Sequence, residues 1–198
     1  IMSSIKLKHS GGNGVIIAAP ANNPAADRTL TCPDLAANAT LATVNGITEV
    51  DQWYVTANQT SNGDITSLAR ASFTNSASPL GTGMSQSSGV FTFPNTGKYL
   101  VIVTASFSIT GGDNVYISTD VSTDGGSSFV IRNYVQDGTS SGTGTIGGGS
   151  TSFTFLDVTS TSDIKVKFNA LSIASGSAIV GDSSIIRTGF TFIRMGDT

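Results

Sequence analysis

A glycine-rich stretch is the first part of the sequence whose residue types suggest chemistry. Residues 142–147 (GTGTIG) fit the pattern GxGxxG, whose glycines let a backbone approach a pyrophosphate where a helix follows a strand. The surrounding residues 138–150 are rich in Gly, Ser and Thr, predict no helix and contain no lysine for a phosphate-binding loop. The sequence therefore predicts a flexible loop here and no nucleotide site.

Groups that could catalyse hydrolysis are few. His9 is the only histidine and Glu49 the only glutamate in the 198 residues, so neither a Ser-His-Asp triad nor a two-histidine metal site is indicated. Asp113, Asp137 and Asp182 could in principle supply the paired carboxylates of a glycosidase, but nothing in their spacing indicates it. We therefore predict that the protein is not an enzyme.

Residues 122–129 (STDGGSSF) match the Asp-box pattern SxDxGxSF of sialidases and other propellers. In those proteins the motif is a folded hairpin and not a catalytic device, so we expect Asp124 to cap its own turn. Asp120 and Asp124 lack the alternating carboxylates and the closing glutamate of a helix-loop-helix calcium site. No cofactor is predicted, and no ligand pattern indicates a structural calcium ion.

Charge and hydropathy exclude two classes of partner. The net charge is −3 and the ten Lys and Arg residues are scattered, so no basic stripe could neutralise the phosphates of a nucleic acid. The longest apolar run, around residues 99–103, is far shorter than the roughly 20 residues that span a bilayer, so no membrane insertion is expected. No secretory signal is recognised at residues 1–4, and Cys32 is expected to be a small core residue.

The composition predicts an all-β protein. Only 12% of the residues are charged and 23 are glycine, while Val, Ile, Phe, Thr and Ser suit pleated strands separated by tight turns. From about residue 53 the strand patterns recur at spacings typical of an antiparallel sandwich or jelly roll. The expected strands cover residues 53–58, 64–74, 90–93, 98–109, 114–123, 128–135, 152–158, 163–170, 177–180 and 185–194.

Turn residues separate these expected strands. The segments 111–114 (GGDN), 124–126 (DGG) and 181–182 (GD) supply the glycines that tight hairpins need at positive φ. Within the strand at 163–170, apolar residues alternate with Asp and Lys, as expected when one face of a strand is wet. The loops at 110–114, 124–128 and 136–150 are candidate contact surfaces, and their binding candidates are Asp113, Asn114, Asp124 and Asp137.

The strand at 98–109 has apolar residues on both faces. Odd-numbered residues from Tyr99 to Phe107 fill one face, while Leu100 and Ile102 occupy the other. No amphipathic helix is available in the sequence to cover a second dry face, so we expect another copy of the protein to cover it. The last strand repeats the two-sided pattern. The candidate residues for the core and the subunit interface are Tyr99, Leu100, Ile102, Phe190 and Phe192.

Residues 1–50 differ from the rest of the chain and form a separate predicted segment, followed by a head domain at 51–198. The first segment holds three of the five prolines and four short strand-like pieces, at 5–8, 15–18, 29–32 and 40–44. Pieces of this length gain stability when copies from several chains stack together, so a stalk or attachment segment is expected. A floppy arm, or a short helix over 34–44 capped by Asp34, remains an alternative.

Residues 90–103 (VFTFPNTGKYLVIV) resemble the signature of the complement-head and tumour-necrosis-factor-like jelly rolls, in which an aromatic-Pro-x-x-Gly-x-Tyr turn leads into a long central strand. The ending at 188–193 (TGFTFI) is similar to the last strand of that family. The resemblance covers about residues 53–198. It implies a ten-strand jelly roll that forms a homotrimer and binds ligands through its loops, in some members with calcium near the axis.

The N-terminal segment resembles a different group of proteins. Residues 5–15 (IKLKHSGGNGV), 19–20 (AP) and 27–34 (DRTLTCPD) are similar to segments of tail fibres and other structural proteins of marine bacteriophages, in which Leu stands at the position of Cys32. The resemblance implies a virion fibre or spike that contacts other virion proteins through this segment and presents its head to a host-surface glycan or protein. A capsid-decorating or neck protein, or a secreted bacterial lectin or adhesin, remains an alternative.

Overall fold

The computed structural model describes residues 4–8, 11, 14–18, 47–72, 79–140 and 144–198. The chain divides into two compact units, Ile1–Ala42 and Thr43–Thr198. In the first unit, β1 (Ser4–Lys8) pairs antiparallel with β2 (Gly14–Ala18), so these two pieces pair within one chain. The predicted strands at 29–32 and 40–44, the alternative helix over 34–44, Cys32 and His9 lie outside the described residues.

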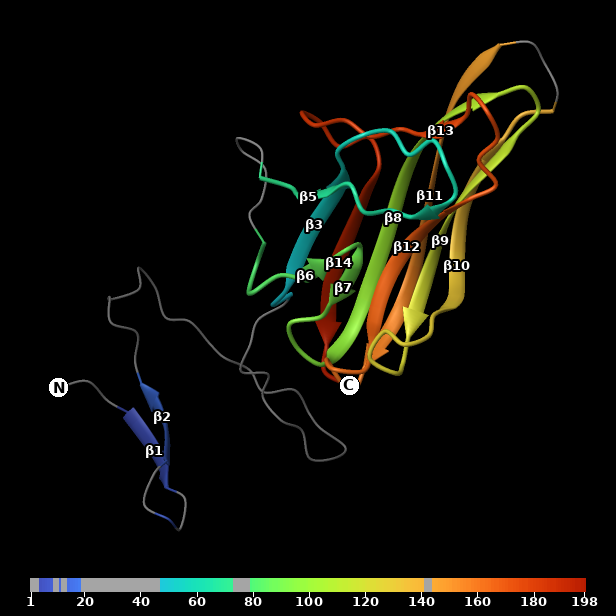
Figure 1. The fold of residues 1–198 in the computed structure, drawn as a ribbon. Helices are drawn as coiled ribbons and strands as arrows, with labels where there is room; N and C mark the ends of the chain where they lie inside the picture. The colour runs from blue at the N-terminus through green and yellow to red at the C-terminus, as the bar shows by residue number, and fades with distance from the viewer. Residues whose placement is uncertain (1–3, 9–10, 12–13, 19–46, 73–78, 141–143) are drawn as a thin grey trace, which may run out of the picture. The chain divides into compact units, whose positions relative to one another are not determined.

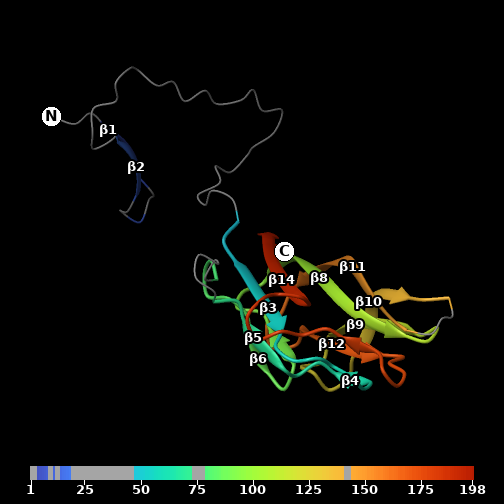
Figure 2. The same cartoon turned by 90° about the horizontal axis from the view of Figure 1, so that it is seen from above.

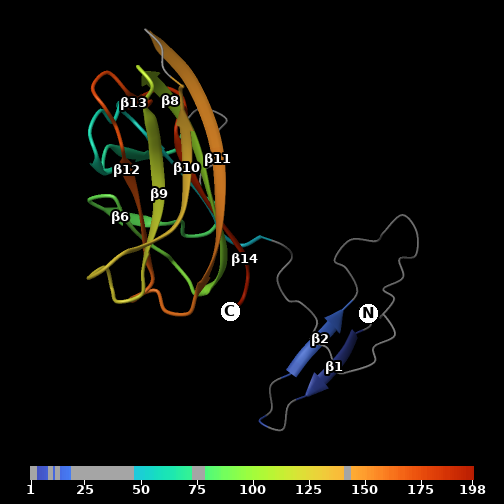
Figure 3. The same ribbon diagram turned by 90° about the vertical axis from the view of Figure 1, so that its right-hand side faces the viewer.

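The second unit is a sandwich of two antiparallel sheets, seen as two layers in Figure 1 and Figure 3. We call them the β8 sheet and the β9 sheet after their central strands. In order across the β8 sheet lie β5 (Leu68–Arg70), β3 (Val50–Val55), β14 (Gly189–Gly196), β8 (Gly97–Thr110) and β11 (Thr145–Val158), with β13 (Ala178–Ile179) paired to β8. Across the β9 sheet lie β6 (Ser85–Ser87), β7 (Val90–Thr92), β12 (Lys165–Leu171), β9 (Asn114–Ser122) and β10 (Val130–Gly138), with β4 (Gly63–Asp64) paired to β12.

The connections make this sandwich a jelly roll. β7 and β8 follow one another in the chain but lie in different sheets, and the same is true of β8 and β9, of β10 and β11, and of β11 and β12. Figure 2 shows these crossings from above. The described residues contain no helix, and therefore none that could span a membrane. The predicted all-β, antiparallel jelly-roll sandwich is confirmed.

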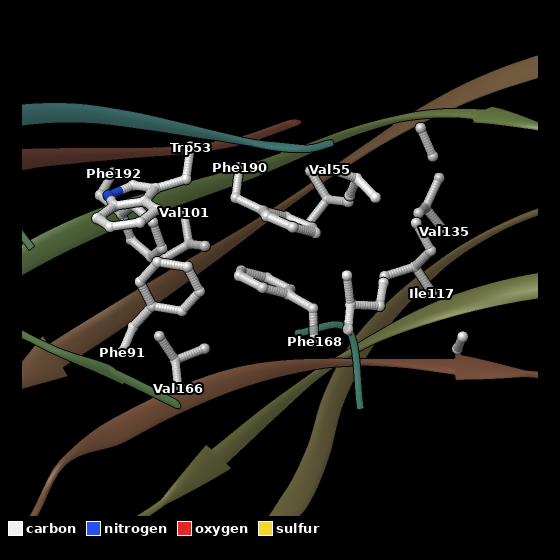
Figure 4. Close-up of a cluster of buried hydrophobic side chains, with 14 of the residues drawn as sticks. Trp53, Val55, Phe91, Val101, Ile117, Val135, Val166, Phe168, Phe190 and Phe192 are labelled. Carbon is white, nitrogen blue, oxygen red and sulfur yellow. The ribbon is translucent and has the colours of Figure 1, made fainter. Parts of the chain in front are cut away.

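Aromatic side chains fill the space between the sheets. Phe168 of the β9 sheet stacks on Phe190 of the β8 sheet, with ring centroids 3.7 Å apart, and Phe91 contacts Trp53 edge to face at 5.4 Å. Figure 4 shows these rings meeting at the middle of the core. Because strand side chains alternate between the two faces, every second residue of β8 from Tyr99 to Ile109 is buried in this core.

The turn before β8 has the structure that its motif predicts. The Tyr99 hydroxyl donates a hydrogen bond to the Asn95 carbonyl at 3.1 Å, and the rings of Phe93 and Tyr99 lie 4.7 Å apart. Gly97 adopts a φ of 146°, and a Cβ there would come within 2.5 Å of Arg194 Nε. The corner thus fixes the direction in which β8 enters the sheet.

The strand predictions differ from the structure in a split strand, a missed strand and several boundaries. The predicted strand at 64–74 is two strands in different sheets, β4 and β5, because the chain crosses over between them and buries Ile65. β6 was missed because its residues, Ser-Gln-Ser, carry no apolar alternation. The last strand begins at Gly189 rather than at 185.

The glycine-rich stretch was also misjudged. Residues 145–150 form the start of β11 and pair in register with β8, with Gly149 opposite Ser106, so they are not a flexible loop. The candidate loop at 136–150 therefore shrinks to residues 139–144, of which 141–143 lie outside the described residues. Gly111, Gly112, Gly125 and Gly126 do adopt positive φ, as predicted. Gly181 does not, and it is close to the Ala57 backbone instead, where a Cβ would collide.

Candidate interaction face

The outer surface of the β8 sheet carries a group of apolar side chains. Leu100 lies opposite Phe155 on one neighbouring strand and opposite Ile193 on the other, and Ile102 lies opposite Phe153. Residues directly opposite one another on antiparallel strands project from the same face of the sheet. These five residues, Leu100, Ile102, Phe153, Phe155 and Ile193, therefore form one continuous patch, which we call the apolar face.

Two phenylalanines of the apolar face are largely uncovered in a single copy of the chain. Phe153 is 63% exposed and Phe155 is 68% exposed, while Leu100, Ile102 and Ile193 are half-buried. Burying one phenylalanine side chain contributes roughly 1.5–3 kcal/mol. Large exposed apolar patches on proteins often serve as interaction sites, so the apolar face is the candidate site.

Beside the apolar face, the outer surface of the β8 sheet carries only small residues. We call this region, around Ser106, Ser108, Gly147 and Gly149, the flat half. Gly147 and Gly149 on β11 lie opposite Ser108 and Ser106 on β8. A Cβ at Gly147 would meet nothing within 4 Å, so no contact in the described part of the chain requires glycine there. Glycine within a strand often marks a place where another backbone approaches closely. The flat half is thus suited to the same packing partner as the apolar face.

Apolar surface continues around the edge where the two sheets meet. β10 and β11 lie side by side in Figure 3, and Asn133 Nδ2 donates a 2.9 Å hydrogen bond to the Phe153 carbonyl across this edge. On β10, Val130, Ile131 and Tyr134 are each about half exposed. The edge and the apolar face together hold half of the exposed large apolar side chains of the described residues.

The five candidates for the core and the interface fall into two groups. Tyr99, Phe190 and Phe192 lie inside the sandwich and are at most 1% exposed, so they are core residues and face no partner. Leu100 and Ile102 lie on the apolar face. The two groups separate because neighbouring strand residues point to opposite faces.

Phe153 and Phe155 were not recognised as candidates from the sequence. The signal was present, because they alternate with Ser152 and Thr154 within the expected strand at 152–158. Read with a period of two, this alternation gives one aromatic and one polar face. In the structure the aromatic face is the outer one, and the Ser and Thr side chains point inward.

Three of the four loop candidates lie at one end of the sandwich, near the β8–β9 and β10–β11 connections. Asp113 Oδ2 accepts a 2.9 Å hydrogen bond from the Ala174 amide, and Oδ1 accepts one from the Asn114 amide at 2.8 Å. Burial alone would raise the pKa of Asp113, but hydrogen bonds from Ala174, Ser177 and Asn114 hold it below its ordinary value. Asp113 therefore joins the β8–β9 turn to the turn around Ala174. Asp137 accepts a hydrogen bond from the Gly138 amide.

Asp124 lies at the opposite end, so the four loop candidates do not form one site. Its carboxylate accepts hydrogen bonds from the Ser122 hydroxyl at 2.6 Å, from the Ser128 hydroxyl at 2.6 Å and from the Ser128 amide at 2.9 Å. These bonds, the one from the Ser122 hydroxyl first, lower the pKa of Asp124 from 3.8 to about 2. The prediction that Asp124 caps its own turn is confirmed, and its acceptors are occupied within that turn.

Two buried carboxylates that were not predicted as functional residues lie at the start of β3, Asp51 within the strand and Glu49 just before it. Asp51 accepts hydrogen bonds from Trp53 Nε1 at 2.8 Å and from the Met84 amide at 2.7 Å, and it forms an ion pair with Arg70. Glu49 accepts hydrogen bonds from Asn95 Nδ2 at 2.8 Å and from the amide of Gly83 at 3.0 Å. Both carboxylates thus hold loops in place, since all four of their oxygens are engaged.

The part of the chain that the structure describes brings no three His, Cys, Asp or Glu side chains together as metal ligands.

Comparison with known proteins gives a structural match and no sequence match. No protein-family model and no curated protein matches the sequence. The structure is similar to that of Eiger TNF from S. frugiperda, with a TM-score of 0.56 and 11% identity over 78% of this chain and 96% of that chain. It is also similar to murine APRIL, with a TM-score of 0.52 and 12% identity over 74% of this chain and 98% of that chain. At such low identity the similarity shows the fold alone, a TNF-like jelly roll.

Proposed function

We propose that this protein is a homotrimeric binding and structural module without catalytic activity. It has a TNF-like jelly-roll fold, and no described part of the chain covers its apolar face. The apolar face is the observation that carries the proposal. Its two exposed phenylalanines lie on β11, an edge strand of the β8 sheet, so they can reach the sheet of a neighbouring copy. In such a contact the partner covers both the apolar face and the flat half beside it.

A threefold assembly suits an off-centre patch of this kind. The aromatic side chains lie at one edge of the β8 sheet, while Leu100 and Ile193 lie nearer its centre. If the edge of one copy packs on the sheet centre of the next, the contact is heterologous and repeats around a closed ring. Three is the number of copies that the resemblance to complement-head and tumour-necrosis-factor-like jelly rolls implies.

The biological setting that we propose is a bacteriophage particle, in which the chain is a fibre or spike. Support comes from the likeness of residues 5–15 and 27–34 to segments of phage structural proteins. The N-terminal unit would join other virion proteins, and the jelly-roll head would contact the host surface. The protein acts in this role by binding, as a part of the extracellular particle.

Two experiments test this setting. Labelling of intact phage particles with an antibody against the head, followed by electron microscopy, should mark projecting fibres or spikes. The purified chain, added to host cells before the phage, should reduce phage adsorption because it occupies the same receptor. Label confined to the capsid shell, together with unchanged adsorption, would instead identify a decorating protein and contradict the attachment role.

A further inference from the structure

An aspartate on the outer surface of the β9 sheet is buried, and one of its carboxylate oxygens has no partner in the described part of the chain. Asp120 alternates with the core residues of β9, such as Val121, and therefore projects from the outer face, yet it is only 5% exposed. Its Oδ1 atom has no hydrogen-bond partner in the described part of the chain, and none of the ion pairs found there includes Asp120. Buried carboxylates are normally paired, so this one calls for a partner outside the described residues.

The lysine across from Asp120 on the neighbouring strand is engaged elsewhere. Lys167 is the cross-strand neighbour of Asp120 on β12, but its Nζ lies 2.9 Å from Asp64 Oδ1 and 4.6 Å from the ring centroid of Phe129. On the other side, Asp120 lies opposite Ile131, and Arg132 follows at a bulge in β10. With Lys167 and Arg132 both nearby, the surroundings disfavour a further positive charge and favour a neutral hydrogen-bond donor.

A second buried acceptor and two aromatic rings lie farther along the same face of the β9 sheet. Asn169 Oδ1 is also buried without a partner in the described residues, and Asn169 lies across from Ser118, which is followed on the next strand by Tyr134. Ser118, which lies between Asn169 and Tyr134, is small and fully buried, so neighbouring side chains cover it. Tyr134 is 53% exposed and contacts Tyr116 edge to face at 5.7 Å.

From this arrangement we infer that the outer face of the β9 sheet binds a carbohydrate, with Asp120 and Asn169 accepting hydrogen bonds from its hydroxyls and Tyr134 packing against its apolar C–H face. Sugar hydroxyls supply the neutral donors that both acceptors lack, and a hydrogen bond to a carboxylate is among the stronger ones. A ring face on an aromatic side chain buries the apolar part of the same ligand. Since both acceptor oxygens lie below the surface, the side chains around them shift when the sugar enters.

The inference rests on the proposed attachment role. It adds carbohydrate as the class of ligand, and it places the contact on the outer face of the β9 sheet instead of on the loops. The probes are methyl glycosides of glucose, galactose, mannose and N-acetylglucosamine, tested against the full chain by saturation-transfer difference NMR. At least one should receive saturation. Asp120→Asn and Tyr134→Ala should each weaken its binding about tenfold or more. Asp163→Asn, the same change at an exposed aspartate of the β11–β12 connection, should leave binding unchanged.

Thermal unfolding separates a ligand-binding aspartate from a structural one. Asp120→Asn keeps the shape of the side chain and removes a buried charge without a partner, so it should raise the Tm by about 2–4 °C. A structural Asp120 would instead lose an internal partner and lower the Tm.

Three results would overturn the inference: no probe binds the unsubstituted chain, Asp120→Asn lowers the Tm without affecting binding, or N-acetyl-arginine amide competes for the face in place of sugars. If the chain remains trimeric and still blocks adsorption after any of these results, the carbohydrate site is disproved and the attachment role is retained.

Discussion

Single aspartates organise the turns of this protein through hydrogen bonds to their carboxylates. Asp124 gathers three such bonds within eight residues of sequence, and Asp113 connects the β8–β9 turn to Ala174. The role of Asp124 could be predicted because every partner belongs to the local motif. The role of Asp113 could not, because its partner lies 61 residues away and only the fold brings the two together.

The lowered pKa of Asp124 gives its hairpin a defined pH dependence. Because the pKa is 3.8 in the unfolded chain and about 2 in the folded one, the ionised carboxylate stabilises the fold above about pH 4, and this contribution disappears as the pH falls to about 2. Asp124→Ala should therefore lower the Tm at pH 6, and the difference from the unsubstituted protein should shrink between pH 4 and pH 2. A difference that stays constant over this range would contradict the assignment.

The buried carboxylate of Asp51 should matter far more than a surface one. Asp51→Ala leaves the Trp53 indole, the Met84 amide and the Arg70 guanidinium without their acceptor, so we expect it to lower the free energy of unfolding by about 3–5 kcal/mol. Asp157, which pairs with Lys98 at the surface, is the control, and Asp157→Ala should cost less than about 1 kcal/mol. Urea unfolding measures both values. Equal losses would show that Asp51 does not hold the β3 end together.

At the scale of the element, strand periodicity explains both what the sequence predicts and what it misses. Ten strand predictions overlap strands of the sandwich because apolar alternation and turn residues mark them. The first half of β11 escaped prediction because its three consecutive glycines, residues 147–149, have little strand propensity, and pairing with β8 overrides that preference. Alternation identified Leu100 and Ile102 as interface candidates. It could not tell which face of β8 lies in the core, because that depends on where the second sheet packs.

Two aspartate substitutions on neighbouring strands should therefore behave differently. Ile102→Asp places a charge on the apolar face and should yield a folded monomer, with near-UV circular dichroism unchanged. Phe192→Asp places a charge in the sandwich core and should prevent folding. Chromatography combined with near-UV circular dichroism distinguishes these results. A trimeric Ile102→Asp protein would show that the apolar face is not the interface.

At the scale of the whole molecule, both features from which we propose a trimer belong to the second of the two units. The apolar face and the flat half beside it both lie in the unit Thr43–Thr198. The TNF-like fold is shared with proteins that are only 11–12% identical, so very different sequences adopt it.

A fragment of residues 43–198 should accordingly fold and form the same trimer as the full chain, with a similar Tm. Removing residues 1–42 takes away no part of the apolar face. Analytical ultracentrifugation of the fragment and of the full chain measures this. If the fragment is a monomer and the full chain is a trimer, assembly depends on the N-terminal unit and not on the head.

The most direct test of the account is the mass of the native protein in solution, measured by light scattering for the unsubstituted chain and for the double variant Phe153→Ser/Phe155→Ser. The account predicts a particle of three 20.2 kDa chains for the unsubstituted protein and a folded monomer for the variant, since the variant removes the two most exposed aromatic side chains of the apolar face. An unsubstituted protein that remains a 20.2 kDa monomer at every concentration tested would contradict it.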